Sequence, residues 1–457
     1  MSISSRYRDA AGARTNAPGA DQARNGDHQM ARQHVGDHAP RATGSPVRSV
    51  QGWPAGTDPL PRRWWLWPLV IYLGTRLVNA VMIVVASNSS ITLEEFVGRG
   101  HLHFGTDAGT APPGYLTAVT RWDGQWYWEI AAHGYPSELP TDASGNVEQN
   151  PWAFFPLYPY LVRGVTFVTR LDFPLASVAV SLVSGAVAML LLYRLVARPH
   201  GSVGGIIAVL AMSTFICAPV MQIGYTEGLA LAFVLAVITC ITQQRYWWAA
   251  LVLLLLGLTR GVAVAFAPAL VLYAFLLWRQ GSLSRRRTVA LGLLAVWAGL
   301  VGIIWPVIVG VATGMPRAYL LTQQAWNPEL TSTPIARFLE RNSDMPGGVT
   351  TAAVVAALWA VLLIWLFTLG QQEPMLRAWT IAYIVYVLAV VDWNWSAVRY
   401  YLLAIPVFWP LVRAGVPEDR PRQRVLVAVV FALVGVAAQW WWIRYCLIVS
   451  RELVQVP

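Results

Sequence analysis

The sequence predicts an all-α membrane protein that crosses the bilayer many times. Of its 457 residues, 56% are hydrophobic and only 12% are charged, and the mean hydropathy is +0.49. A typical soluble domain carries about 25% charged residues, so the low charge content indicates the polytopic membrane class. Apolar runs long enough to cross a bilayer, about 20 residues each, recur along the chain.

The net charge of +10 does not indicate a nucleic-acid partner. All 33 basic residues are arginines, and most lie in the N-terminal segment or in short gaps between apolar runs. Short arginine-rich gaps mark the cytoplasmic side of membrane proteins. The absence of lysine is typical of a GC-rich genome, and it leaves arginine as the cation for any phosphate contact.

Residues 1–63 are rich in Ala, Gly, Pro, Arg, Asp and His and show almost no apolar periodicity. Such a segment cannot bury enough apolar surface to fold, so we predict a disordered cytoplasmic tail. The first apolar stretch begins near Trp64 and is long enough to span, which separates it from a cleavable signal. The expected domains are the tail, 1–63, and one transmembrane domain, 64–457.

About eleven spans are expected after the tail. Their approximate bounds are 64–86, 173–197, 203–221, 226–242, 246–258, 261–278, 288–312, 350–370, 377–391, 400–414 and 424–449. With the tail inside, the arginine cluster between Arg279 and Arg287 also falls inside. A further crossing at 154–171 would place that cluster outside, so we predict that this segment is a helix at the outer interface. The protein is then multi-pass in the cell membrane, with a cytoplasmic N-terminus.

Two long intervals, about 87–172 and 313–349, form outer loops in this topology, and long loops commonly carry function. The first contains RWDGQWYWEIAAHGYP, whose aromatic residues suit a helix in the interfacial plane. Gly134 and Pro136 predict where that helix ends. Asp123 has two interpretations: a helix cap that accepts backbone N–H groups, or a functional carboxylate. Both remain open, since a capping aspartate can also face a cavity.

Further ionisable residues fall at the outer ends of later spans. Glu227 follows Thr226 at a helix start, where negative charge is favoured. Arg260 and Arg399 lie against the positive-inside bias, so a local partner is expected for each, although either alone suits an arginine reaching towards the interface. Taken with Asp123, they indicate an outward site for an anionic substrate. Arginine grips phosphate with two hydrogen bonds, and a carboxylate takes a proton from a hydroxyl.

The order of these motifs resembles the PIG-V-type mannosyltransferases, which belong to the GT-C class of polytopic glycosyltransferases. The matching segments are RWDGQWYWEIAAHGY (121–135), AFFPLYPYLVR (153–163), APVMQIGYTE (218–227), LTRGV (258–262) and RYYLLAIP (399–406). The first two are the most specific. The arginine- and alanine-rich composition suggests an actinobacterial member.

This resemblance implies a GT-C-like transmembrane bundle whose long first outer loop carries interfacial helices. It implies transfer of a hexose, mannose in this family, from a polyprenyl-phosphate donor to a hydroxyl of a lipid or glycan acceptor outside the cytosol. Asp123 takes the role of catalytic base in a reaction that inverts the anomeric centre.

The expected substrate-binding residues are Arg121, Glu227, Arg260, Arg399 and Tyr400. Arg260 and Arg399, with Arg121 third, are candidates for the phosphate because of their charge and side of the membrane. Glu227 is expected to orient the acceptor or to steady an arginine. No metal-ligand cluster is visible, and neither a metal nor a cofactor is expected.

Two other functions compete with the enzyme: a transporter or flippase of a lipid-linked or anionic substrate, and a non-catalytic membrane scaffold. Transporters place charges near the bilayer midplane on broken helices. Here the ionisable residues lie at the outer ends of spans, beside a long aromatic loop, which favours the enzyme. The three cysteines, Cys217, Cys240 and Cys446, lie in apolar runs without a CxxC pair and are expected to be core residues.

Overall fold

The computed structural model describes residues 62–92, 114–326, 373–390, 397–405 and 420–450, with scattered residues between 350 and 365. Regular secondary structure in these ranges is helical, apart from an isolated β-bridge between Thr141 and Val147. Five of the described helices are long and apolar enough to cross a membrane. The predicted tail, 1–63, lies outside the described residues except for its last two positions.

The five long apolar helical segments are α1 (Leu66–Ser87), α6 (Phe173–Ser213), the 3-10 helix η3 with α9 (Gly261–Ala265 and Phe266–Arg279), α10 (Arg285–Ala312), and α17 with the π-helix η6 (Pro421–Trp442 and Ile443–Leu447). Three shorter apolar helices are α7 (Glu227–Thr242), α8 (Tyr246–Gly257) and α14 (Pro374–Val390). The remaining helices are α3 (Tyr115–Val119), α4 (Asp123–His133), η1 (Pro151–Ala153), α5 (Leu157–Thr169), η2 (Ala218–Gln222), α11 (Ala318–Trp326), α15 (Ala397–Tyr400) and η5 (Tyr401–Ala404).

Exposed apolar side chains identify the surface that lipid would cover. Leu77 on α1 is 68% exposed, Leu293 on α10 is 67% exposed and Leu433 on α17 is 66% exposed. Exposed apolar surface of this kind on long helices is unfavourable in water and favourable against acyl chains. The described part of the chain is therefore an all-helical membrane protein.

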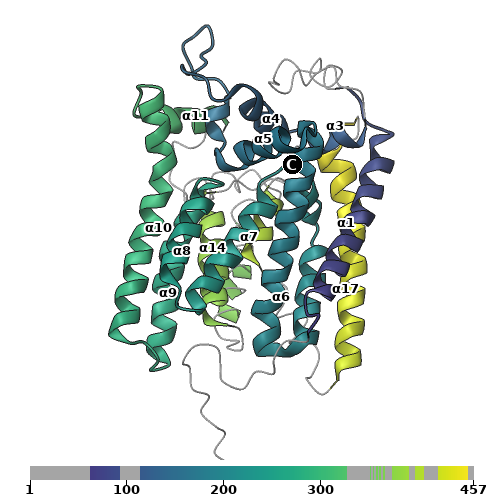
Figure 1. Ribbon diagram of the computed structural model, residues 1–457, viewed down its shortest axis with the longest axis vertical. Helices are drawn as coiled ribbons and strands as arrows, with labels where there is room; N and C mark the ends of the chain where they lie inside the picture. Colours follow the sequence, from purple (N-terminus) through teal and green to yellow (C-terminus); the bar gives the residue numbers. More distant parts are fainter. Residues whose placement is uncertain are drawn as a thin grey trace, which may run out of the picture. The chain divides into compact units, whose positions relative to one another are not determined.

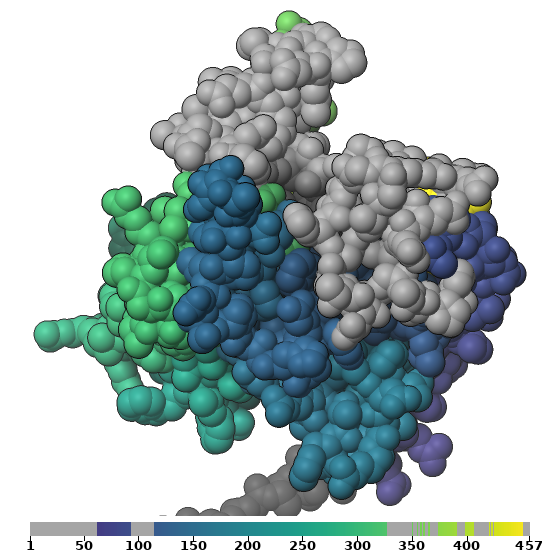
Figure 2. Space-filling model, turned by 90° about the horizontal axis from the view of Figure 1, so that it is seen from above, coloured from purple at the N-terminus to yellow at the C-terminus, as the bar shows by residue number. Residues whose placement is uncertain are grey.

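The short helices gather at one end of the bundle. In Figure 1, α3, α4, α5 and α11 lie at the top of the long helices, and this end is called the α4 end below. Because α11 follows the last residue of α10, the turn between Arg279 and Arg285 lies at the opposite end. Seen from the α4 end, residues of α4 and α5 (blue) lie between α11 (green) on one side and α1 (purple) on the other (Figure 2).

Most of the expected spans that fall in the described ranges coincide with helices. The spans at 64–86, 226–242, 246–258, 261–278, 288–312, 377–391 and 424–449 correspond to α1, α7, α8, η3 with α9, α10, α14, and α17 with η6. The expected break between 197 and 203 is a kink inside α6 at Gly201, whose φ is 75°, two residues after Pro199. The span expected at 350–370 lies mostly outside the described residues.

The span expected at 203–221 ends early. α6 stops at Ser213, and residues up to 222 form a turn and the 3-10 helix η2. Polar side chains from two other helices donate hydrogen bonds to backbone carbonyls at this break. Arg76 Nη2 donates to Ser213 O at 2.7 Å, and Gln439 Nε2 donates to Phe215 O at 2.8 Å. Pro219 also lacks the N–H that a continuing α-helix needs.

The span expected at 400–414 does not begin as an α-helix. Residues Tyr401–Ala404 form the 3-10 helix η5, and Ile405 has a φ of 52°, which ends it. Trp379 Nε1 and Thr380 Oγ1 of α14 donate to the carbonyls of Leu403 and Ala404, at 2.8 and 2.9 Å. The proline at 406 also disfavours helical backbone in the preceding residue. The rest of this span lies outside the described residues.

Candidate active site

The start of α4 is fixed by Trp122. Its φ of 57° lies in the left-handed region, which is strained for a tryptophan, and its indole Nε1 donates to Leu447 O at 2.8 Å. Trp122, and not Asp123, is the N-cap residue, and no side chain caps the helix. The interpretation of Asp123 as a helix cap is therefore wrong, because Asp123 is the first helical residue and its carboxylate bonds to an arginine. The helix ends at Gly134 with a φ of 82°, as predicted.

The GYTE segment, residues 224–227, lies against the start of α4. Gly224 N donates to Val119 O at 2.7 Å. A Cβ at Gly224 would lie 3.1 Å from both Val119 O and Ser177 Oγ, so only glycine allows this close approach without movement of its neighbours. The contact brings Glu227, the first residue of α7, beside Asp123.

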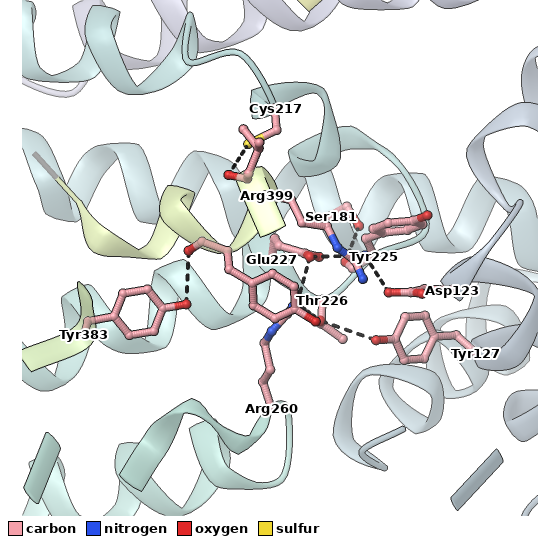
Figure 3. Close-up of polar contacts among 12 residues, drawn as sticks. Asp123, Tyr127, Ser181, Cys217, Tyr225, Thr226, Glu227, Arg260, Tyr383 and Arg399 are labelled. Atoms are coloured by element: carbon pink, nitrogen blue, oxygen red, sulfur yellow. Dashed lines mark hydrogen bonds and ion pairs between the residues drawn. The ribbon is translucent and has the colours of Figure 1, made fainter. Parts of the chain in front are cut away.

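Four ionisable side chains from four separate segments form one continuous network. Arg399 Nη1 lies 2.5 Å from Asp123 Oδ2 and 3.5 Å from Glu227 Oε1. Arg260 Nη1 lies 2.8 Å from the same Glu227 oxygen. Figure 3 shows the two arginines reaching Glu227 from opposite sides. The structure thus brings together Asp123, Glu227, Arg260 and Arg399, which the sequence separates by up to 276 positions.

Burial differs along this network. The Glu227 side chain is 1% exposed and that of Arg399 is 6% exposed, whereas Arg260 is 11% and Asp123 is 20% exposed. Asp123 is therefore the member that solvent or a substrate reaches most readily. Its Oδ2 binds Arg399, and no hydrogen bond to Oδ1 is found among the described residues.

The carboxylates stabilise the charged form of both arginines. Burial by itself would lower the pKa of Arg399, but Asp123 and Glu227 outweigh burial and hold that pKa well above its ordinary value. Burial also lowers the pKa of Arg260, but the Glu227 carboxylate and Tyr400 outweigh it and raise that pKa above its ordinary value. Both guanidinium groups therefore remain cationic at any physiological pH.

Tyr400 lies between the two arginines. The Cζ atom of Arg260 is 4.4 Å from the centroid of its ring, and that of Arg399 is 5.4 Å away. Both distances are within the range of cation–π attraction. Tyr383 Oη of α14 donates to the Tyr400 carbonyl at 3.0 Å, which ties α15 to the bundle and holds the Arg399 segment in place.

Arg121 lies apart from the network. Among the described residues it forms no ion pair, and its Nη1 is buried without a hydrogen-bond partner, although the residue is only 6% exposed. Burial lowers the pKa of Arg121 to about 10, so it too is cationic at neutral pH. A buried cation without a carboxylate is costly, which makes Arg121 available to an anion.

Three further residues support the network and were absent from the predicted set. Thr226 Oγ1 accepts from Arg260 Nη1 at 3.0 Å and from Tyr127 Oη at 3.4 Å. The ring of Tyr225 lies 5.2 Å from the Arg399 Cζ. Tyr225 and Thr226 belong to the GYTE motif and Tyr127 to the RWDGQWY stretch, but only the fold shows that these side chains lie beside the network. In the described residues no group of three or more His, Cys, Asp and Glu side chains is placed to hold a metal ion.

No family model matches the chain and no curated protein matches it, so the resemblance to PIG-V-type enzymes rests on the motifs. Several solved structures are similar. An oligosaccharyltransferase from Archaeoglobus fulgidus, in complex with zinc and sulfate, is 13% identical with a TM-score of 0.45. That match covers 82% of this chain and 52% of the other, so the chain spans about half the length of that enzyme.

Two further solved structures are also similar to the chain. ArnT from Cupriavidus metallidurans, bound to undecaprenyl phosphate, is 14% identical with a TM-score of 0.44 over 84% of this chain and 76% of the other. The oligosaccharyltransferase AglB from Archaeoglobus fulgidus, with an inhibitory peptide and a dolichol-phosphate, is 13% identical with a TM-score of 0.42, over 83% and 55% of the two chains. The side-chain network, and not these distant matches, is the basis of the function proposed below.

Proposed function

We propose that the protein is a membrane glycosyltransferase that moves a hexose from a polyprenyl-phosphate donor to a hydroxyl of a lipid or glycan acceptor. One observation carries this proposal: an accessible carboxylate, Asp123, lies in the same network as two buried arginines at the α4 end. Acid–base chemistry on a hydroxyl needs such a carboxylate, and a phosphate leaving group needs fixed cations close by. Mannose is the hexose that the motif resemblance implies.

Asp123 is the proposed base. The acceptor oxygen forms a bond to the anomeric carbon from the face opposite the phosphate, and the acceptor proton moves to the Asp123 carboxylate. The bond between the anomeric carbon and the phosphate oxygen breaks, and its electron pair stays on the departing polyprenyl phosphate. The configuration of the anomeric carbon is inverted, and Asp123 then returns its proton to solvent.

Arg399 and Arg260 are the proposed cations for the leaving group. Negative charge grows on the phosphate as the bond breaks, so guanidinium groups fixed beforehand stabilise the transition state more than the bound donor. Glu227 is almost fully buried between the two arginines, and we assign it the role of a positioning residue that holds both. Of the two roles expected for Glu227, this is the one in which it steadies an arginine.

The site is proposed to face outside the cytoplasm. Arg279, Arg285 and Arg286 are exposed at the opposite end, which by the positive-inside rule would be cytoplasmic. A transporter is less well supported, because Glu227 is the first residue of α7 and Arg260 directly precedes η3, so both charges lie at helix ends.

The test is sugar transfer by membranes that contain the protein, with radiolabelled polyprenyl-phosphate mannose as the donor. The Asp123→Asn variant should lose about 10²- to 10⁴-fold in rate, the usual contribution of a general base. The matched control is Asp172→Asn, since Asp172 is exposed at the start of α6 and asparagine is an equally good residue there. Undiminished transfer by Asp123→Asn would remove Asp123 from the role of base, and no transfer by the wild type to native lipids or glycans would overturn the enzyme itself.

A further inference from the structure

The network at the α4 end is electrically complete without a substrate. It contains two carboxylates, Asp123 and Glu227, and two guanidinium groups, Arg260 and Arg399, and each guanidinium contacts at least one carboxylate. A donor phosphodiester brings a third anion. If it added to this set without a change, the buried site would hold one uncompensated negative charge, which is strongly unfavourable.

One contact in the network is the easiest to open. Glu227 is 1% exposed, so withdrawing an arginine from it would leave a fully buried carboxylate with one fewer cation. Asp123 is 20% exposed, so its carboxylate can be rehydrated when it leaves Arg399. The Asp123–Arg399 pair is therefore the place where an incoming phosphate meets the lowest cost, even though its 2.5 Å contact is the shortest of the three ion pairs.

The same contact occupies part of the Asp123 carboxylate. Arg399 Nη1 holds Oδ2 at 2.5 Å, so this oxygen is not open to an acceptor hydroxyl while the ion pair stands. The donor phosphate is an anion that the reaction itself supplies, and it offers Arg399 another partner.

From these observations we infer that the donor phosphate displaces Asp123 from Arg399, and that this exchange frees Oδ2 of the carboxylate for the acceptor hydroxyl. This inference rests on the proposed function.

The test measures the affinity of the purified full-length protein for undecaprenyl phosphate, the lipid present in the ArnT structure, by tryptophan fluorescence in detergent. In Asp123→Asn the competing anion is gone while the side-chain shape remains, so affinity should rise about tenfold, equivalent to about 1.4 kcal/mol. Arg399→Gln should bind weakly, and the double variant Asp123→Asn/Arg399→Gln should show no gain over Arg399→Gln.

The matched control is Glu129→Gln. Glu129 lies on α4 six residues after Asp123, is partly exposed and makes no contact with Arg399, so its loss changes the local charge equally without removing a competitor. Affinity in this variant should change by less than about twofold, as expected for a screened charge.

Three outcomes separate the inference from the function on which it rests. An equal rise in Asp123→Asn and Glu129→Gln would mean a general charge effect and would overturn the exchange. Unchanged affinity in Asp123→Asn, with sugar transfer by the wild type intact, would overturn the exchange and leave the transferase standing. No binding of undecaprenyl phosphate by either the wild type or Asp123→Asn, together with no transfer, would remove both.

Discussion

The two ends of the bundle contain the same kinds of ionisable side chain in different arrangements. At the α4 end, the guanidinium groups of Arg260 and Arg399 both face carboxylates, and the chain of contacts ends at the partly exposed Asp123. At the opposite end, Arg287 Nη2 donates to the phenol Oη of Tyr273 at 2.6 Å. Glu373, also at that end, uses its Oε2 to accept from Leu376 N at 2.8 Å, which caps α14.

The two ends differ in whether their charged side chains are exposed or are paired inside the fold. The exposed arginines at the opposite end, Arg279, Arg285 and Arg286, need no carboxylate partner, because water or lipid head groups can surround them. At the α4 end, Arg260 and Arg399 lie inside the fold and are matched by carboxylates from distant segments. Such matched burial is expensive to assemble and indicates a function more strongly than the number of charges does.

The largest expected effect on stability is that of Glu227→Gln. It leaves two buried guanidinium groups without their shared carboxylate, and removal of one partner of a buried ion pair costs about 3–5 kcal/mol. The apparent melting temperature in detergent should fall clearly, and sugar transfer should be lost. The exposed Glu138, at the same end, supplies the control Glu138→Gln. Equal melting temperatures for the two variants would contradict the role of Glu227 as the centre of the network.

Arg399→Gln and Arg287→Gln compare one arginine from each end. Loss of a cation from the leaving-group site should reduce the rate of transfer about 10²- to 10³-fold. Arg287→Gln removes one hydrogen bond, worth about 1 kcal/mol, from a region remote from the reaction, so the rate should stay within about threefold of the wild type. Steady-state rates normalised to the amount of folded protein measure both. A comparable loss in both variants would erase the distinction between the two ends.

Tyr400 tests the contribution of its aromatic ring. Cation–π contacts contribute about 0.5–2 kcal/mol, so Tyr400→Leu should weaken donor binding about 2- to 30-fold, whereas Tyr400→Phe keeps the ring and should bind nearly as well as the wild type. At the opposite end, Tyr273→Phe should leave donor affinity unchanged. If Tyr400→Phe were as weak as Tyr400→Leu, the hydroxyl and not the ring would be the important group.

The smallest expected effect concerns Glu373. Burial raises the pKa of Glu373 to about 7, against the opposing backbone hydrogen bonds and the charge of Arg287. Because this pKa is raised on folding, the folded state binds the proton more tightly, and the group's contribution to stability is lost as pH rises from about 4.5 to 7. Glu373→Gln removes that loss, so its melting temperature relative to the wild type should increase by about 2 °C between pH 5 and pH 8. A difference that does not vary with pH would show that Glu373 is ionised throughout.

Local patterns in the sequence predicted the long elements and named four ionisable side chains that the structure brings together. Apolar runs of sufficient length coincide with α1, α7, α8, α9 and α10, and Gly134 ends α4 as expected. Arg260 and Arg399 were selected because charge at an outer helix end requires compensation. The structure supplies it, through Glu227 for both arginines and Asp123 for Arg399.

Contacts between distant segments decided what local patterns missed. α6 ends at Ser213 because Arg76 and Gln439 take carbonyl groups there. η5 ends at Ile405 because α14 takes the preceding carbonyls. Neither donor is visible from the hydropathy of the segment that it interrupts.

Asp123 also shows the difference between what local sequence predicts and what distant contacts decide. Its sequence position suits a helix cap, since aspartate at a helix start accepts local N–H groups. In the structure Trp122, whose indole donates to Leu447 O, precedes the helix and Asp123 is the first helical residue. The Asp123 carboxylate accepts a hydrogen bond from Arg399, 276 positions away. The sequence by itself determined the helical membrane class and which residue types are chemically capable, because both depend on local composition and spacing. Only the tertiary structure decided which charges pair, which arginine remains unpaired and which carboxylate stays accessible, because those depend on packing between segments far apart in the chain.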